Sequence, residues 1–192
     1  MRPVTLTSDR FVMSVPVPGD AEAVFDACQD PEIQRWTTVP SPYERVHAVE
    51  YCTTAAAQWQ SGAEQLWAIR DGGLLLGVIG LHRTSDDSAD LGYWIGPTAR
   101  GRGVLTEAAR VVLDWGFAAD GGAYARIGWR AAAGNRASAR AARALGFRFE
   151  GTSRMAFPSA RGREDAWFAG LLPDDDRVPR DWPVLAAASS PP

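Results

Sequence analysis

The hydrophobic pattern of the first third of the chain predicts one strand followed by three helices. Loose alternation of apolar and polar residues over 6–15 is typical of a strand. Asp20 follows a Pro-Gly turn and is the expected N-cap of a helix reaching Ala27, and Asp30-Pro31 begins a short helix over 32–36. A longer helix is expected over 43–61, with Val46, Val49 and Ala56 among its apolar positions.

The rest of the chain alternates between strand and helix patterns. Strands are expected over 66–70 and 74–82, joined by the hairpin signal Asp71-Gly72-Gly73. The remaining elements are strands over 90–95, 124–130, 147–155 and 165–172, a helix over 106–119 with apolar Leu105, Ala108, Ala109, Val112 and Trp115, and a helix over 135–145 ending at Gly146. One domain is expected over 1–173, followed by an acidic, then Pro/Ala-rich and mobile tail over 174–192 that Trp182 would anchor.

The composition narrows the class of protein. With 192 residues, 46% hydrophobic and 22% charged, the chain is long enough to form one domain with a full core. The net charge is −3 and no basic run stands out, so nucleic acid is not expected as a partner. The longest apolar run, 74–81, is too short to cross a membrane, and no signal peptide is expected. Cys28 and Cys52 form no metal spacing and favour a reduced, cytoplasmic setting without a metal site.

A glycine-rich turn, Arg100-Gly-Arg-Gly-Val-Leu-Thr106, stands between a predicted strand and a predicted helix. The start of a helix has unpaired N–H groups and partial positive charge, and glycines allow an anion to approach them closely. Gly101 and Gly103 alone are equally consistent with a plain strand-to-helix turn. The lysine of a Walker loop is absent, which disfavours a P-loop nucleotidase.

Five short motifs in order resemble the GNAT N-acetyltransferase superfamily, and within it the RimJ/RimL-like branch that acetylates protein N-terminal amines. They are Gly92-Tyr-Trp-Ile95, Ala99-Arg-Gly-Arg-Gly103, Thr106-Glu-Ala108, Asn135-x-x-Ser138 and Leu145-Gly-Phe147, and the likeness extends over residues 6–172. The resemblance implies a mixed α+β fold, the GNAT acyl-CoA N-acyltransferase fold. Its central sheet is twisted, mostly antiparallel, built of six to seven strands and flanked by about four helices.

The resemblance also implies that acetyl-CoA lies between the strand ending at Ile95 and the strand ending near Arg130. The family's pyrophosphate signature, Arg/Gln-x-x-Gly-x-Gly/Ala, is matched by Arg100-x-x-Gly103-x-Leu105, so the last position departs from it. The backbone of Trp94 and Ile95 would hold the acetyl and pantetheine portion, and Asn135 would contact the CoA arm, cap its own helix, or do both. The implied cofactor-binding residues are Trp94, Ile95, Arg100, Gly101, Arg102, Gly103, Val104, Leu105, Thr106, Asn135 and Ser138.

The catalytic residues are less certain from the motifs. Ser138 matches a serine that is a candidate proton donor to the departing thiolate, but a solvated or capping serine is the plain alternative. Many relatives carry a tyrosine acid where this chain has Ala142, and the direction of Tyr93 is not evident from the sequence. Asp90 is the expected base, acting through water, or else a solvated strand-end residue.

Other side chains are candidates for the acceptor region or for structural roles. Trp36 and Tyr43 lie in the region that shapes the acceptor pocket in relatives, although Trp36 also suits a core position. Glu107 suits a charge at a helix start, Glu164 and Asp165 are candidate carboxylates near the acceptor, and His47 and His82 are expected to be structural or exposed.

These residues favour an acetyl-CoA-dependent N-acetyltransferase that acts directly on a primary amine, as a monomer or homodimer. At pH 7 a lysine amine costs about 4.6 kcal/mol to deprotonate and an α-amine only about 1 kcal/mol, so an α-amine can work with a weak base. An N-terminal α-amine of a protein or peptide is therefore the expected acceptor. Two alternatives remain open, a small amine such as an antibiotic or polyamine, and a CoA-binding regulatory module without catalysis.

Overall fold

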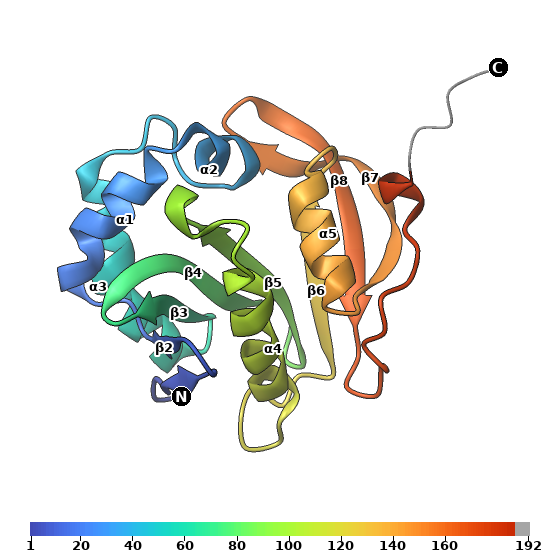
Figure 1. Ribbon diagram of the computed structural model, residues 1–192, viewed down its shortest axis with the longest axis horizontal. Helices are drawn as coiled ribbons and strands as arrows, with labels where there is room; N and C mark the ends of the chain where they lie inside the picture. The colour runs from blue at the N-terminus through green and yellow to red at the C-terminus, as the bar shows by residue number, and fades with distance from the viewer. Residues whose placement is uncertain (187–192) are drawn as a thin grey trace.

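A single sheet runs through the protein, in the strand order β1-β2-β3-β4-β5-β6-β8-β7 (Figure 1). The computed structural model describes residues 1–186. All neighbouring strands are antiparallel except β5 and β6, which confirms the expected mostly antiparallel sheet. The strands are β1 (Leu6–Thr7), β2 (Val12–Ser14), β3 (Glu64–Asp71), β4 (Leu74–Arg83), β5 (Ser88–Ile95), β6 (Arg126–Ala132), β7 (Arg148–Ser159) and β8 (Gly162–Leu171).

The sheet has eight strands because the single strand expected over 6–15 is a small hairpin. Leu6 pairs with Met13 and Thr7 with Val12, and the turn between them is closed by a 2.9 Å hydrogen bond from Ser8 N–H to Phe11 O. Alternating patterns cannot distinguish one long strand from two short ones when the turn lacks glycine. The hairpin brings Ser8 and Arg10 back toward the middle of the molecule.

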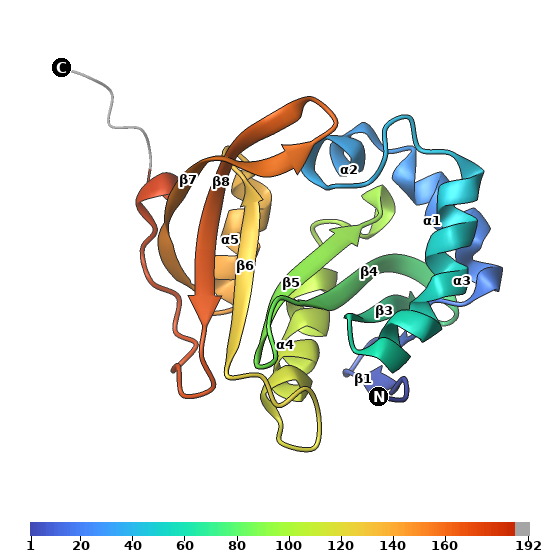
Figure 2. The same ribbon diagram turned by 180° about the vertical axis from the view of Figure 1, so that it is seen from behind.

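Five α-helices cover the sheet. Figures 1 and 2 show α4 and α5 on one face and α3 on the other, with α1 packed on α3. In the described part of the chain, no helix combines the length and apolarity needed to span a membrane. The helices are α1 (Ala21–Cys28), α2 (Pro31–Trp36), α3 (Arg45–Ser61), α4 (Val104–Phe117) and α5 (Arg136–Ala144), with short 3₁₀ turns at Pro18–Asp20, Pro97–Ala99 and Pro183–Leu185.

The packing of α3 departs from its apparent apolar face. Val46 and Val49 are 58% and 49% exposed, and Ala56 is exposed too. The buried stripe is instead Ala48, Cys52, Ala55 and Trp59. Ala48 and Cys52 are small and pack in one cluster with Val24 and Cys28 of α1, whereas Trp59 packs on Trp67 of β3. Small side chains at this 4-3-4 spacing allow a close approach that β-branched valines would prevent. The hydrophobic pattern located this helix, and side-chain size decided its orientation.

Asp20 precedes α1 as expected, but its side chain does not cap the helix. Its carboxylate accepts hydrogen bonds from both terminal nitrogens of Arg70, at 2.7 and 2.6 Å, and from Val17 N–H. A bidentate bond to a guanidinium is stronger than a cap bond, so the capping prediction was wrong. The ion pair joins the start of α1 to β3.

The two parallel strands β5 and β6 separate along their length. Ser88, Ala89 and Asp90 pair with Arg126, Ile127 and Gly128, and beyond Asp90 no further pairs form. Figure 2 shows the strands diverging toward the α2 end of the molecule. Backbone groups on one edge of each strand are therefore left without a strand partner, as at a sheet edge. The gap between the two strands is where the cavity of the candidate site opens.

The segment after β8 packs against the domain. Trp182 is 2% exposed, lies 5.4 Å from both Trp129 and Phe149 between ring centroids, and donates to Phe147 O. Arg148 pairs with Asp175 and Asp176. Trp182 thus anchors this segment up to residue 186. The predicted mobility of the tail stays a prediction for 187–192, which include Ser189-Ser-Pro-Pro192 and lie outside the described residues.

Candidate functional site

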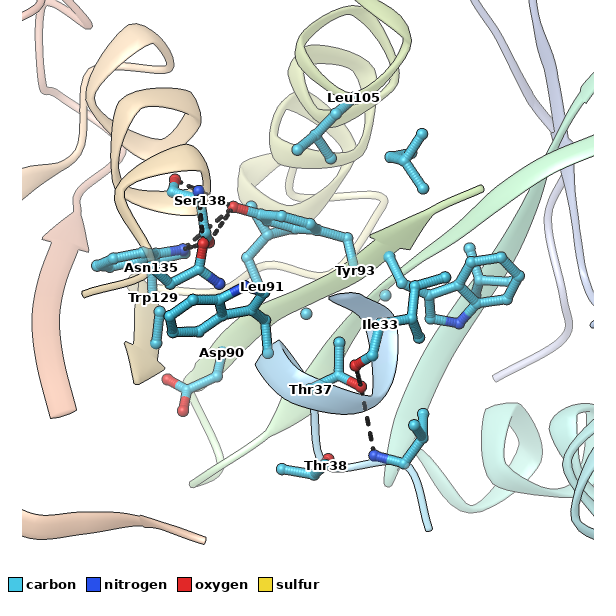
Figure 3. A pocket seen from close by; sticks show the side chains of 18 of the residues that line it. Ile33, Thr37, Thr38, Asp90, Leu91, Tyr93, Leu105, Trp129, Asn135 and Ser138 are labelled. Atoms are coloured by element: carbon cyan, nitrogen blue, oxygen red, sulfur yellow. Dashed lines mark hydrogen bonds between the residues drawn. The ribbon is translucent and has the colours of Figure 1, made fainter. Parts of the chain in front are cut away.

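A cavity of about 900 Å³ opens where β5 and β6 diverge (Figure 3). One side of it is built by the starts of α4 and α5, and the other by α2, α3 and the opposite face of the sheet. Its lining includes most of the predicted site, namely Trp36, Asp90, Trp94, Ile95, Arg100, Gly101, Gly103, Val104, Leu105, Thr106, Asn135 and Ser138.

The start of α4 presents a row of unpaired backbone N–H groups. The first helical bond is from Glu107 N–H to Gly103 O, and the amides of residues 101–106 have no acceptor in the described part of the protein. Gly101 and Gly103 take positive φ values of +72° and +75°, which curl the chain so that successive amides converge. This geometry suits a diphosphate or a similar anion.

Leu105 does not block this row of N–H groups at residues 101–106, which we call the cradle. Its side chain packs against the main hydrophobic core while its N–H remains free. A bulky residue at the irregular last position of the signature is therefore tolerated, because the cradle uses backbone groups alone.

The cradle is braced from the N-terminal hairpin. The carboxylate of Glu107 accepts hydrogen bonds from Ser8 Oγ at 2.7 Å and from Arg10 Nε at 2.7 Å, and Arg10 also donates to Arg102 O at 3.2 Å. Desolvation would raise the pKa of Glu107, but the bonds from Ser8 and Arg10 outweigh it and lower the pKa. Glu107 is thus ionised and holds the helix start to the hairpin.

Arg100 connects the two sides of the site. Its guanidinium donates to the Asp30 carboxylate, at 2.8 Å for the shorter bond, and to Ile95 O at 3.1 Å. Asp30 in turn caps α2 by accepting from Ile33 N–H. The cradle and the helix that carries Trp36 are therefore held together.

Three polar groups meet on the α5 side of the cavity. Ser138 Oγ lies 2.8 Å from the Tyr93 hydroxyl, and Trp129 Nε1 donates to both oxygens, at 3.1 and 3.2 Å (Figure 3). Burial raises the pKa of Tyr93, although its bonds with Ser138 and Trp129 oppose the shift. The phenol is therefore protonated at neutral pH. Tyr93 and Trp129 were not predicted as site residues, because only the fold turns them toward Ser138.

Asn135 is confirmed as the N-cap of α5. Its Oδ1 accepts from Ser138 N–H at 3.1 Å, which fixes Ser138 in the first turn of the helix. The side chain is nearly buried and lines the cavity, so its amide nitrogen is available to a ligand there.

The ladder between β4 and β5 decides which backbone groups face the opening. Gly96 N–H bonds to Leu76 O directly across the ladder. Backbone groups of successive residues alternate in direction, so those of Trp94 turn toward β4 and those of Tyr93 and Ile95 turn toward β6. The backbone groups of Tyr93 and Ile95, and not those of Trp94, therefore face the opening.

The opposite side of the cavity is aromatic and acidic. Trp36 lines it, and its indole nitrogen donates to Glu32 at 2.9 Å. Tyr43 does not line the described cavities; it is buried beside Cys28 in the core between α1 and α3, so its predicted substrate contact was wrong. Tyr51, Glu64 and His82 line the wall instead, and the sequence contained no spacing that joins these three elements.

Asp90 lies at the mouth of the cavity, with its carboxylate 3.4 Å from Arg130 Nε. Glu164 and Asp165 do not line the cavity: Glu164 pairs with Arg35 and Arg161, and Asp165 accepts from Met155 N–H. Within residues 1–186, no cluster of His, Cys, Asp and Glu could hold a metal ion.

Comparison with known proteins places this geometry in context. A family model described as an acetyltransferase (GNAT) domain matches residues 10–148. The uncharacterized N-acetyltransferase YoaA of Bacillus subtilis (strain 168) is 31% identical over 154 residues, covering 78% of this chain and 86% of the relative.

Solved structures share the fold. RimJ of Mycobacterium smegmatis in complex with CoA-disulfide aligns with a TM-score of 0.79 at 20% identity, over 90% of each chain. The microcin C7 self-immunity acetyltransferase MccE, in complex with acetyl-CoA and AMP, aligns at 0.77 and 18%, over 85% of this chain and 93% of that one. The ribosomal L7/L12 α-N-protein acetyltransferase RimL, in complex with coenzyme A, aligns with a TM-score of 0.77 at 16% identity. The alignment covers 86% of this chain and 95% of RimL.

Proposed function

Given that the chain belongs to the acetyltransferase (GNAT) family, we propose that it transfers the acetyl group of acetyl-CoA directly to an N-terminal α-amine of a protein or peptide. The single observation that carries the donor assignment is the row of free amides at residues 101–106, which opens into the same cavity as Ser138. A diphosphate bound there would direct the rest of the CoA arm along the gap between β5 and β6.

The acetyl-CoA site fits the residues present. The diphosphate would lie on the amides of the Gly101–Thr106 turn, where the α4 dipole also favours negative charge. The pantetheine arm would follow the β5 edge, where the backbone groups of Tyr93 and Ile95 face the opening. Asn135 would contact the arm from the α5 side. Backbone donors of this kind also stabilise the oxyanion that forms during acyl transfer.

The hydrogen-bond pattern around Ser138 supports a source of the proton that the departing thiolate needs. Trp129 Nε1 can only donate, so it uses an acceptor position on Ser138 Oγ and on the Tyr93 oxygen. The Tyr93 hydroxyl lies 2.8 Å from Ser138 Oγ and 3.3 Å from Ser138 O. Donation to the nearer oxygen is favoured, and it leaves the Ser138 hydrogen free to point into the cavity. Ser138 then protonates the thiolate as the carbon–sulfur bond breaks, and Tyr93 replaces the charge-stabilising contact that Ala142 cannot make.

The side of the cavity opposite Ser138, which we call the acceptor side, suits an amine that carries positive charge before it reacts. Glu32, Glu64 and Asp90 line it, and Trp36 supplies an aromatic surface. An α-amine needs only about 1 kcal/mol to lose its proton at pH 7, which matches a site without a strongly basic group. RimL, whose structure shares this fold, is a ribosomal L7/L12 α-N-protein acetyltransferase, which supports the same acceptor class. We place the activity in the cytoplasm, where the buried free thiols of Cys28 and Cys52 would stay reduced.

A thiol-release assay with acetyl-CoA tests the proposal. Turnover on short peptides with a free N-terminal amine, but not on the same peptides after N-terminal blocking, is the expected result. Turnover on polyamines or aminoglycosides alone would replace the peptide acceptor by a small amine. Tight acetyl-CoA binding in calorimetry without turnover on any amine would indicate a non-catalytic CoA-binding module. If acetyl-CoA does not bind, all three functions are rejected: peptide acetylation, small-amine acetylation and the binding module.

A further inference from the structure

His82 stands at the point where the cavity begins, on the sheet face opposite Tyr93. It pairs across β4 and β5 with Asp90, the last β5 residue that also pairs with β6. Its ring lies over Gly92, so closely that a Cβ on Gly92 would overlap Nε2. Because side chains alternate along β5, Tyr93 points to the other face. The imidazole and the Tyr93–Ser138 pair thus border one cavity from opposite faces of the sheet.

The orientation of the imidazole is set by Glu64. Glu64 on β3 is directly opposite His82 in the ladder, and its Oε1 lies 2.9 Å from Nδ1. The bond with His82 lowers the pKa of the Glu64 carboxyl, which is therefore ionised and accepts a hydrogen from Nδ1. In the neutral ring this leaves the lone pair on Nε2, the nitrogen over Gly92. Nε2 has no hydrogen-bond partner among residues 1–186.

We propose that Nε2 of His82 accepts the proton that the acceptor amine loses, directly or through one water, and that Glu64 is the positioning residue for this step. The inference rests on the proposed acetyl transfer. The amine nitrogen forms a bond to the acetyl carbon, the carbon–sulfur bond breaks, and one amine proton passes to Nε2. Ser138 gives a proton to the sulfur, and both groups then exchange with solvent. Attacking nitrogen and departing sulfur are different substituents of one carbon, so an acid and a base on opposite faces suit the reaction.

His82 suits this role better than Asp90. The Asp90 carboxylate is shared with Arg130, whereas Nε2 is free. Histidine is also the side chain that most often serves as a general base. Asp90 contributes negative charge that attracts the ammonium form of the acceptor.

The other charged and titratable groups around the ring do not compete for the proton. Arg83 follows on β4 and Arg130 faces from β6, and both are permanently charged donors. Tyr51 faces from α3, and burial together with the nearby Glu64 raises the pKa of its hydroxyl, which stays protonated. Among the described groups around the ring, His82 alone offers a nitrogen lone pair without a hydrogen-bond partner.

The variant H82Q tests the role with a peptide that the unmodified protein acetylates. We expect kcat/KM for the peptide to fall by about 100-fold, the usual scale of general-base catalysis, with the acidic limb of its pH profile lost. The Kd for acetyl-CoA should stay the same. Added imidazole should restore activity to H82A, since the removed ring leaves a matching space. E64Q should lower kcat while leaving the Kd for acetyl-CoA unchanged, and E64D should recover part of the loss.

The chain contains only two histidines, so NMR of the ring nitrogens in the unmodified protein can report the His82 tautomer. This measurement does not depend on enzymatic activity. We expect the His82 signals to show the Nδ1–H tautomer and to shift when CoA and the peptide bind together. H47Q is the matched control, because His47 does not line the cavity: it accepts from Glu44 N–H at the start of α3 and packs beside Tyr43. An Nε2–H tautomer, or an unchanged kcat/KM and pH profile in H82Q, would overturn the inference alone. No turnover by the unmodified protein would overturn the proposed function and this inference with it.

Discussion

The hydroxyl of Tyr93 on β5 lies 2.8 Å from Oγ of Ser138 in the first turn of α5. The contact joins the two secondary-structure elements that form the donor side of the cavity. It also places a phenol beside Ser138, the proton donor that we propose, although residue 142, where the resemblance implies a tyrosine, is alanine. We propose that the Tyr93 hydroxyl takes the place of that missing hydroxyl.

Replacing Ser138 by alanine should remove the proton that reaches the thiolate. We expect kcat to fall by at least about 10²-fold, while the Kd for acetyl-CoA in calorimetry changes less than about twofold. Stability should change little, because Asn135 still caps α5 through the backbone N–H of residue 138. An unchanged kcat would remove Ser138 from the mechanism.

Tyr93→Phe tests whether the phenol acts through Ser138. The ring remains, so packing is retained, and we expect kcat to fall by roughly 10-fold because Ser138 Oγ loses a donor. In the Ser138→Ala background the same change should have almost no further effect on kcat, because residues that act as a unit are not additive. Additive effects in this double-mutant cycle would show that Tyr93 acts independently.

Gly101→Ala should weaken acetyl-CoA binding by at least about 10-fold, because Gly101 has a φ of +72° and a methyl group would occupy open space beside the free amides. Gly72→Ala in the β3–β4 hairpin is a matched control, with a φ of +54° and equally open surroundings. Both should lose about 1 kcal/mol of stability from backbone strain. Only Gly101→Ala should raise the Kd, as measured by calorimetry; equal Kd values would reject the cradle.

Trp182→Ala should destabilise the protein by about 3 kcal/mol, the usual cost of truncating a buried tryptophan. Because Trp182 packs on Trp129, which donates to Ser138 Oγ, kcat should also fall in the fraction that remains folded. Denaturant unfolding and steady-state kinetics measure the two effects. A stable, fully active variant would mean that the segment after β8 is dispensable.

The ion pair of Asp20 with Arg70 predicts a pH-dependent contribution to stability. Burial alone would raise the pKa of Asp20, but the bonds from Arg70 and Val17 outweigh it and lower the pKa. A lowered folded-state pKa stabilises the protein fully above the unfolded value of about 3.9, and this stabilisation is lost as the pH falls toward the folded value. Asp20→Asn should cost about 3 kcal/mol at pH 7 and progressively less below about pH 4.

The exposed pair between Glu22 and Arg45 provides the control for this prediction. Glu22→Gln should change the free energy of unfolding by less than about 1 kcal/mol at either pH, because solvent screens an exposed pair. Urea unfolding at pH 7 and at about pH 3, below the unfolded pKa, measures both variants. Equal losses of unfolding free energy in the two variants would show that the Asp20–Arg70 pair stabilises the protein no more than the exposed pair does.

Features that depend on neighbouring residues were predictable from the sequence. The β3–β4 hairpin, the start of α2 at Asp30-Pro31, the cap at Asn135 and the turn before α4 all follow from residues within a few positions of one another. The sheet expected from the resemblance is also present. The face of α3 was not predictable, because Ala48 is buried in the cluster with α1 and Val46 is exposed, and the position of α1 is not a local property.

The same division holds for the site. By itself, the sequence determined the anion cradle, because glycine conformations and the unpaired amides of a helix start are properties of a single continuous segment. Only the tertiary structure decided the chemical groups around the acetyl position. Tyr93, Trp129 and Ser138 come from three elements, as do Tyr51, Glu64 and His82, and Tyr43 is turned into the core. Side-chain direction across a cavity depends on strand register and helix packing, which bring together residues that are distant in the chain.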